Sequence, residues 1–311
     1  MASIVQVRNL SKRFAGLTAV NDLSFDVPEG KIYGFLGQNG AGKSTTIRML
    51  LTLIRPSDGT IEIMGMDLHK KRRDILKQVG AVIERPDLYK YLTALENLRL
   101  FAAMNGLRFS RQQLLDQLER VGLADRAHSK IRTYSQGMKQ RLGIAVALVH
   151  DPALVVLDEP TNGLDPQGIA DIRNLILQMS RHLKKTVIVS SHLLSEMELI
   201  ADHLLIIDKG KKVQEGRAHD LFDPQQTVVE LKTGDINAAC EKIKQSPWTN
   251  HLVSRHTDRI LFKIAYQDLP LLANALQQMD IPIYSYYAKN SLEEYFLSLT
   301  SANQHVETFT N

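Results

Sequence analysis

The hydrophobic pattern of the first 220 residues separates into strand-like and helix-like segments. Residues 3–9 and 23–27 alternate apolar and polar side chains, which is typical of half-buried strands. Ile32 to Leu36, Ala153 to Leu157 and Thr186 to Ser190 are short, mainly apolar runs, as expected for strands buried on both faces. Apolar residues with helical spacing lie between these strands, and they predict helices over 45–52, 92–104, 111–121 and 136–149. The alternation predicts a parallel α/β sheet with helices on both faces.

The pattern changes after about residue 220. Asp220 to Pro224 is interpreted as a linker. The remainder predicts, in order, strand 227–232, helix 236–244, a strand pair within 252–264, helix 268–279, strand 281–287 and helix 291–299. This order is compatible with a split βαβ domain. We therefore expect one domain over residues 1–220 and a small α+β domain over residues 221–311.

Composition adds few constraints. The chain has 311 residues, of which 44% are hydrophobic and 23% charged, as in ordinary globular proteins. The formal net charge is only +4, and the one dense basic run, Lys70 to Arg73, is interpreted as a solvated surface turn. Cys240 is the single cysteine, so an internal disulfide is excluded. No apolar run approaches the ~20 residues of a membrane span, so we expect any link to a membrane to be made through a partner.

A glycine-rich stretch follows the predicted strand 32–36. It fits the pattern G-x-x-x-x-G-K-[ST] between a strand and a helix, which is the context that a phosphate-binding loop requires. Backbone amides would surround an anion, Lys43 would contact the β- and γ-phosphates, and the Ser44 hydroxyl would hold Mg²⁺. The predicted nucleotide-binding residues of this loop are Gly37, Gln38, Asn39, Gly40, Ala41, Gly42, Lys43, Ser44 and Thr45.

Two acidic residues end the predicted strand 153–157. Asp158 would emerge at the carboxyl end of that strand, where open α/β sheets bind ligands, and could hold the metal through a water molecule. Glu159 could polarise an attacking water as a general base. An alternative interpretation makes both acids an N-cap of the following helix. Together with the phosphate loop, the pair favours a P-loop NTPase.

Residues 134–141 read Tyr-Ser-Gln-Gly-Met-Lys-Gln-Arg. This stretch resembles the signature motif of ATP-binding cassette (ABC) ATPases, usually Leu-Ser-Gly-Gly-Gln followed by a basic residue, Gln and Arg. Ser135 and Gly137 match that motif, whereas Gln136 and Met138 replace a glycine and a glutamine. Because the phosphate loop already holds its own nucleotide, the resemblance implies that Ser135 and Gly137 bind the ATP of a second copy of the chain.

Three more residues carry the same resemblance. The stretch from Asn162 to Asp165 is similar to the D-loop, which crosses the dimer interface in this family, and Asp165 is its last residue. His192 stands where the family places a histidine that contacts the γ-phosphate. Phe14 matches the aromatic residue that stacks on adenine. The resemblance covers roughly residues 3–220. It implies an ABC nucleotide-binding domain with a helical subdomain at about 85–150, ATP and Mg²⁺ as ligands, and Lys43, Glu159 and His192 as the catalytic residues.

One position departs from the family pattern. The ABC family usually has a glutamine, which reaches Mg²⁺ and water, where this chain has Glu84. A carboxylate can still ligate Mg²⁺, so Glu84 is a candidate metal ligand beside Ser44 and Asp158. It would also place negative charge beside the γ-phosphate unless Arg85 or the metal offsets it. We hypothesise that Glu84 tunes hydrolysis and coupling.

The glutamate at position 84, residues 134–141 and residues 159–166 are together similar to bacterial ATPases of bacitracin and lantibiotic self-protection exporters. The stretch 291–297 is similar to the tails of ATPases paired with ABC-2 type permeases. The resemblance implies an ATP-hydrolysing subunit with two partners: a second copy of itself and a separate transmembrane permease that contacts Glu84 to Leu95. No nucleic-acid partner is expected, and the expected location is the cytoplasmic face of the cell membrane.

Three alternatives are weighed against this interpretation. A soluble ABC ATPase acting on DNA or ribosomes usually carries a long coiled coil or two cassettes, and neither is found in this sequence. A sugar-importer ATPase usually carries a barrel-type tail, whereas residues 221–311 have an α/β pattern. An ATP-sensing scaffold without turnover would not need the catalytic set of Lys43, Asp158, Glu159 and His192.

Overall fold

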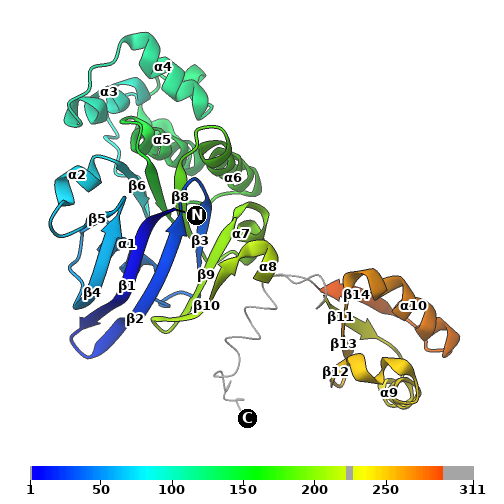
Figure 1. Cartoon of the computed structure of the whole chain (residues 1–311). Helices are drawn as coiled ribbons and strands as arrows, with labels where there is room; N and C mark the ends of the chain where they lie inside the picture. Colours follow the sequence, from blue (N-terminus) through cyan, green and yellow to red (C-terminus); the bar gives the residue numbers. More distant parts are fainter. Residues whose placement is uncertain (1, 222–226, 290–311) are drawn as a thin grey trace, which may run out of the picture. The chain divides into compact units, whose positions relative to one another are not determined.

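The computed structural model of the chain describes residues 2–221 and 227–289. The chain divides between Arg217 and Ala218 into two compact units (Figure 1). Each unit has a hydrophobic core of its own. No helix among the described residues is long and apolar enough to cross a membrane.

A six-stranded sheet runs through the first unit in the order β10-β9-β3-β8-β7-β6. All neighbouring strands are parallel except β10, which is antiparallel to β9. The predicted strands 32–36, 153–157 and 186–190 are confirmed as the buried strands β3, β7 and β8. The bounds are β3 Ile32–Leu36, β6 Val79–Ile83, β7 Leu154–Asp158, β8 Thr186–Ser191, β9 His203–Asp208 and β10 Lys211–Arg217.

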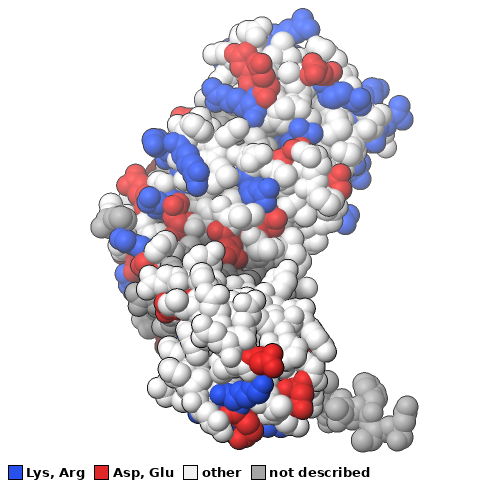
Figure 2. Space-filling view, turned by 90° about the vertical axis from the view of Figure 1, so that its right-hand side faces the viewer, with Lys and Arg blue, Asp and Glu red and all other residues white. Residues whose placement is uncertain are grey.

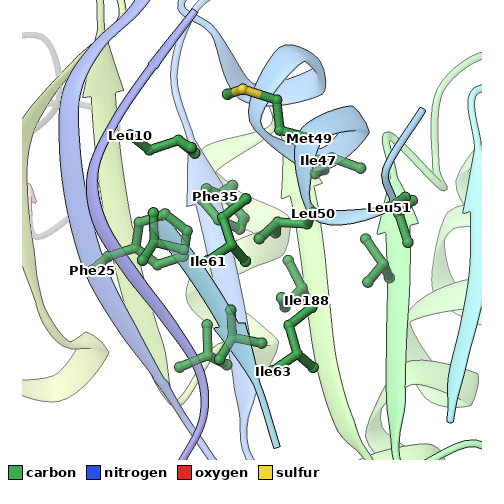
Figure 3. Packing of buried hydrophobic residues seen from close by; sticks show 14 of the residues in the cluster. Leu10, Phe25, Phe35, Ile47, Met49, Leu50, Leu51, Ile61, Ile63 and Ile188 are labelled. Atoms are coloured by element: carbon green, nitrogen blue, oxygen red, sulfur yellow. The ribbon is translucent and has the colours of Figure 1, made fainter. Parts of the chain in front are cut away.

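A second, antiparallel sheet packs on one face of this parallel sheet. It has the order β2-β1-β4-β5 and comprises β1 Ser3–Phe14, β2 Leu17–Pro28, β4 Asp58–Ile63 and β5 Met66–Asp67. Figure 3 shows Phe25 and Ile61 of this sheet meeting Phe35 of β3 and Leu50 of helix α1 (Lys43–Leu50). The prediction of helices on both faces is therefore wrong for this face. Residues 3–9 and 23–27 bury their apolar side chains here, so a sheet supplies most of the cover.

Helices cover the opposite face of the parallel sheet. They are α5 Gln136–Leu148, α6 Pro166–Arg181 and α7 Leu194–Ile200, which contact β6, β8 and β3 respectively. Two glycines permit the close approach. A Cβ atom at Gly34 would lie 2.6 Å from the terminal carbon of Met197, and one at Gly80 would lie 2.1 Å from the Ala147 carbonyl oxygen. The packing of α5 on β6 thus requires the absence of a side chain at Gly80.

The helical subdomain contains α3 Ala94–Met104 and α4 Arg111–Arg120 together with α5 (Figure 1). Thr93 and Ser110 each cap one of these helices, and Glu96 and Gln113 complete reciprocal capping boxes. The apolar stripes of the three helices meet in one core that includes Leu98, Leu114 and Leu142. The predicted helices 92–104, 111–121 and 136–149 agree with these elements to within two residues at each end.

The basic run Lys70 to Arg73 is exposed, as predicted, although its second half begins the short helix α2 Arg72–Leu76. Ile75 anchors that helix in the core of the first unit. Lys and Arg side chains are interspersed with Asp and Glu on the face drawn in Figure 2. That face therefore carries no continuous basic surface.

The second unit has the sheet order β12-β13-β11-β14 with antiparallel neighbours. Because β13 lies between β11 and β12, the arrangement is the predicted split βαβ. Its elements are β11 Thr227–Lys232, α9 Ile236–Lys244, β12 Leu252–Arg255, β13 Ile260–Ile264, α10 Leu269–Gln278 and β14 Ser285–Lys289.

Two predictions for this region differ from the structure. Asp220 and Leu221 belong to a short helix, α8 Ala218–Leu221, and residues 222–224 of the predicted linker lie outside the described residues. The last described strand starts at residue 285 instead of 281, because the Ile281 amide still bonds to the Leu276 carbonyl at 3.1 Å and the Ile281 side chain fills the core. The predicted helix 291–299 and the tail stretch 291–297 lie outside the described residues.

The contact between α5 and β6 can be tested by adding one methyl group. We expect Gly80→Ala to lower the free energy of unfolding by about 1–3 kcal/mol, the usual range for overpacking a core. Gly137→Ala is the matched control, because no atom lies within 4 Å of a Cβ built there. Thermal unfolding followed by circular dichroism measures both variants. A Gly80→Ala melting temperature equal to that of the wild type would contradict the close packing of α5 on β6.

Candidate nucleotide-binding and hydrolysis site

The glycine-rich loop joins β3 to α1, and its glycines have different roles. A Cβ at Gly37 would lie 2.4 Å from the Ile207 carbonyl oxygen, and one at Gly42 would lie 2.7 Å from the Ala19 carbonyl oxygen. Both positions are therefore closed to any side chain. Gly40 has a positive φ of 83° and no atom within 4 Å of an added Cβ, so the loop is open on that side. Glycine at position 40 thus serves the turn and leaves room for an anion.

Lys43 begins α1 and is almost completely buried, with 5% of its surface exposed. Its Nζ donates hydrogen bonds to the carbonyl oxygens of Gly37 at 2.6 Å and Gln38 at 3.3 Å. No side chain caps the helix at Gly42, so the amides of the first turn face the loop without a side-chain acceptor. A buried ammonium beside an uncapped helix N-terminus is an arrangement that binds phosphate.

The Asp158 carboxylate at the end of β7 lies between two hydroxyls. Ser44 Oγ donates to its Oδ1 at 3.1 Å, and Ser190 Oγ donates to the same oxygen at 2.5 Å. The second oxygen, Oδ2, is buried and has no hydrogen-bond partner among the described residues. A buried carboxylate oxygen that lacks a donor, beside a serine hydroxyl, fits a divalent cation with oxygen ligands.

The protein groups alone would not complete such a cation site. In residues 2–221 and 227–289, no group of three or more His, Cys, Asp or Glu side chains could hold a metal ion. Mg²⁺ takes six oxygen ligands and is commonly bound through one or two protein groups plus phosphate and water. The donor set of Ser44 and Asp158 therefore fits a cation that arrives with a phosphate ligand.

Glu159 directly follows Asp158 and is held at three points. Its amide donates to Ser190 Oγ at 2.9 Å, its Oε1 lies 3.4 Å from Lys43 Nζ, and its Oε2 lies 2.7 Å from Nδ1 of His192. Its backbone has a φ of 48°, a conformation that non-glycine residues seldom adopt and that occurs at functional sites. The three predicted catalytic residues, Lys43, Glu159 and His192, are thus linked through one carboxylate.

An open cleft of about 640 Å³ lies beside these groups, and three of them, Ser44, Asp158 and Glu159, line it. Its walls come from α1, the ends of β6 and β7, the first residue of α5 and the loop after β7. The lining residues are Ser44, Ile83, Glu84, Arg85, Gln136, Asp158, Glu159, Asn162 and Gly163. The three predicted metal ligands, Ser44, Asp158 and Glu84, therefore share the cleft with the candidate base Glu159.

Glu84 has a different charge partner from the one expected. Its carboxylate forms an ion pair with Arg48 of α1 rather than with the neighbouring Arg85. Arg48 lies one turn beyond Ser44 on α1, and its guanidinium reaches Glu84, the residue after β6. Of the two groups considered as offsets, Arg85 forms no ion pair with Glu84 in the described residues, and Arg48, which was not considered, takes that place.

Besides Lys43, His192 and the phosphate-loop residues other than Ser44, four more predicted site residues lie outside the lining of this cleft. Phe14 ends β1 with 48% of its surface exposed, and Lys12 Nζ lies 5.0 Å from its ring centroid. Ser135 caps α5 by accepting a hydrogen bond from the Met138 amide at 3.2 Å, and Gly137 is open to space. Asp165 caps α6 through the Gly168 amide at 3.1 Å. The helix-capping role considered for Asp158 and Glu159 therefore belongs to Asp165.

The remaining loop residues also differ in exposure. Asn39 is exposed, Gln38 and Thr45 are half-buried, and Ala41 is buried with its amide bonded to the Gln38 carbonyl at 3.1 Å. Sequence reasoning missed Ser190 and Arg48. A serine at the end of the apolar run 186–190 and an arginine four residues after Ser44 were the available signals.

Comparison with known proteins agrees with this geometry. The ABC transporter family model matches residues 20–162. The chain is 40% identical to the ABC transporter ATP-binding protein YhcH of Bacillus subtilis, over 96% of this chain and 97% of the relative. It is 39% identical to the bacitracin transport ATP-binding protein BcrA of Bacillus licheniformis, over 96% and 98% respectively. It is 38% identical to the lantibiotic transport ATP-binding protein SrtF of Streptococcus pyogenes, over 75% and 97%.

A solved structure extends the likeness to the fold. The dimeric post-hydrolysis structure of the ATP-binding cassette MJ0796, bound to ADP and Pi, has a TM-score of 0.62 and 25% sequence identity, and covers 69% of this chain and 98% of that one. The P-loop architecture predicted from the sequence is thereby confirmed. The chain belongs to the ABC transporter family, as an ATP-binding subunit that hydrolyses ATP.

Proposed function

We propose that the chain drives an exporter that protects a bacterium from peptide antibiotics of the bacitracin or lantibiotic type, together with a separate permease. The similarity to BcrA extends over both units and reaches 98% of that relative, which supports the substrate class. The observation that carries the hydrolytic part is the Glu159 carboxylate, which lies in the cleft between Lys43 and His192.

In the proposed mechanism, phosphate oxygens replace the present hydrogen-bond and ion-pair partners of Lys43. Its Nζ bonds to the carbonyls of Gly37 and Gln38 and lies 3.4 Å from Glu159. Phosphate oxygens would compete for the same ammonium, which draws Lys43 away from Glu159. Mg²⁺, held by Ser44 Oγ and Asp158 Oδ2, would supply charge neutralisation at the phosphates. Phe14, whose ring is exposed, would stack on the adenine ring.

Hydrolysis then depends on the freed Glu159 oxygen. With Lys43 on the phosphates, Oε1 can accept a proton from an attacking water. His192 keeps Oε2 at 2.7 Å, and the Ser190 hydroxyl keeps the Glu159 amide at 2.9 Å, so the carboxylate stays oriented toward the cleft. The same Ser190 hydroxyl bonds to Asp158, which couples the positions of the base and of the proposed metal ligand.

A second copy of the chain would complete each site. The start of α5 is open around Gly137, and the Ser135 hydroxyl stands at a helix N-terminus that is suited to an anion. The loop Asn162 to Asp165 would cross between the copies. The dimeric cassette structure bound to ADP and Pi supports this arrangement. Two ATP molecules would thus lie between two chains, and their hydrolysis would reopen the dimer.

The permease would dock on the first unit between β6 and α3. This contact would hold the chain at the cytoplasmic face of the membrane. Tyr89 and Tyr91 are exposed there by 52% and 82% of their surface. Aromatic side chains of this kind are enriched at protein interfaces because each combines a large apolar ring with a polar hydroxyl.

We expect Glu159→Gln to bind ATP but to reduce the hydrolysis rate by at least about 100-fold, the usual contribution of a general base. ATP should then hold two chains together, which size-exclusion chromatography with light scattering detects. Glu196→Gln is the matched control. It makes the same chemical change in α7, where Glu196 forms an ion pair with Arg173 of α6, and it should retain activity. Hydrolysis by Glu159→Gln at the wild-type rate would exclude Glu159 as the base.

The exporter itself can be tested by growth. A susceptible bacterium that expresses the chain with its permease should tolerate more bacitracin or lantibiotic than one that expresses the permease alone. The Glu159→Gln chain with the permease should give no gain, because transport requires turnover. Equal tolerance with and without the wild-type chain would contradict the proposed substrate class while leaving the ATPase intact.

A further inference from the structure

Helix α1 supplies two cations that pair with carboxylates of the cleft, and only the first cation belongs to the phosphate loop. Lys43 pairs with Glu159, and Arg48 pairs with Glu84. Ser44 and Arg48 are four residues apart, so they lie on the same face of the helix. The guanidinium of Arg48 thus extends along the side of α1 that carries the proposed metal-binding hydroxyl.

The two carboxylates occupy equivalent places on neighbouring strands. Ile83 of β6 is directly opposite Asp158 of β7 in the parallel register, so Glu84 and Glu159 are the next residues along each strand. Both have left-handed backbones, with φ of 55° and 48°. Both line the same cleft. The strand ends therefore present two acidic side chains next to each other. Each forms an ion pair with a basic side chain of α1.

This arrangement creates a charge problem when a triphosphate enters. Asp158, Glu159 and Glu84 are all acidic, and the buried Lys43 is required by the phosphates. Glu84 has 65% of its side chain exposed, and Arg48 is its only ion-pair partner in the described part of the chain. Without Arg48, the Glu84 charge would add to the repulsion of the incoming phosphates.

We propose that Arg48 is a positioning residue that neutralises Glu84 and holds it against α1, so that the cleft accepts the γ-phosphate. The inference rests on the proposed binding of ATP in this cleft. Since the γ-phosphate is the group that adds charge beyond ADP, Arg48 contributes to the preference for ATP over ADP. The site can then contain the Glu84 carboxylate because Arg48 neutralises its charge.

The test compares Arg48→Gln, Glu84→Gln and the double variant in the full-length chain. Equilibrium binding of Mg–ATP and Mg–ADP is measured by competition with a fluorescent nucleotide at low ionic strength. Arg48→Gln should weaken ATP binding by about fivefold, the upper range for a partly exposed ion pair, and ADP binding by less. The double variant should return to within about twofold of the wild type, because the unpaired carboxylate is gone.

Arg85→Gln is the matched control, because Arg85 lines the same cleft but makes no ion pair in the described residues. It should change the ratio of ATP to ADP affinity less than Arg48→Gln does, and Glu84→Gln should not rescue it. Equal weakening of both nucleotides by Arg48→Gln, or no rescue in the double variant, would overturn the proposal.

A second readout separates this inference from the proposed function. Melting temperatures of the four chains without nucleotide form a double-mutant cycle, and a favourable coupling between Arg48 and Glu84 is expected. A wild-type chain that bound neither nucleotide would overturn the proposed function and the role of Arg48 in nucleotide preference, whereas the coupling in the melting temperatures would still show the ion pair. Additive effects on the melting temperature would overturn the pair itself.

Discussion

The parallel register of four buried strands is the constraint on which the site depends. β3, β8, β7 and β6 are neighbours in one sheet, and their carboxyl ends lie at the same edge. Asp158 ends β7, and the phosphate loop, His192, Glu159 and Glu84 each directly follow one of these strands. Successive side chains of a strand point to opposite faces, so a slip of one residue in β7 would turn Asp158 away from Ser44. The apolar side chains that bury both faces of the sheet therefore also align the catalytic groups.

Charge balance is the second level of organisation at this edge. Lys43 and Arg48 of α1 each face a carboxylate, and His192 contacts the same carboxylate as Lys43. The ion pair of the buried Lys43 with Glu159 is less exposed than the pair of Arg48 with Glu84. In this account, phosphate replaces Glu159 as the partner of Lys43, while Arg48 keeps Glu84. In this scheme, ATP binding replaces contacts that Lys43 already makes, and the backbone around the site keeps its arrangement. Because Lys43, Ser44 and Arg48 are close together on α1, this one helix contacts all three acidic residues of the site.

Much of this could be predicted from the sequence, where the determinants are local. The phosphate loop, the buried strand before Asp158 and the helices of the subdomain are contiguous patterns with specific caps and glycines. The antiparallel sheet over the core could not be predicted, because alternation in residues 3–9 shows a half-buried strand without naming its partner. The pairing of Glu84 with Arg48 depends on strand register and helix phase, which a neighbour in sequence such as Arg85 does not reveal. Asp165 resembled a dimer contact by position, and the structure shows that its carboxylate caps α6.

The most direct test of the shared site is a crystal structure of the Glu159→Gln chain with Mg–ATP. Lys43 Nζ should have left the Gly37 and Gln38 carbonyls for phosphate oxygens, and the cation should be bound by the Ser44 hydroxyl and, through a water molecule, by Asp158. Ser135 and Gly137 of a second copy should close over the same phosphates. A nucleotide bound within one chain, with Lys43 still on the loop carbonyls and Ser135 of the second copy far from it, would contradict the account.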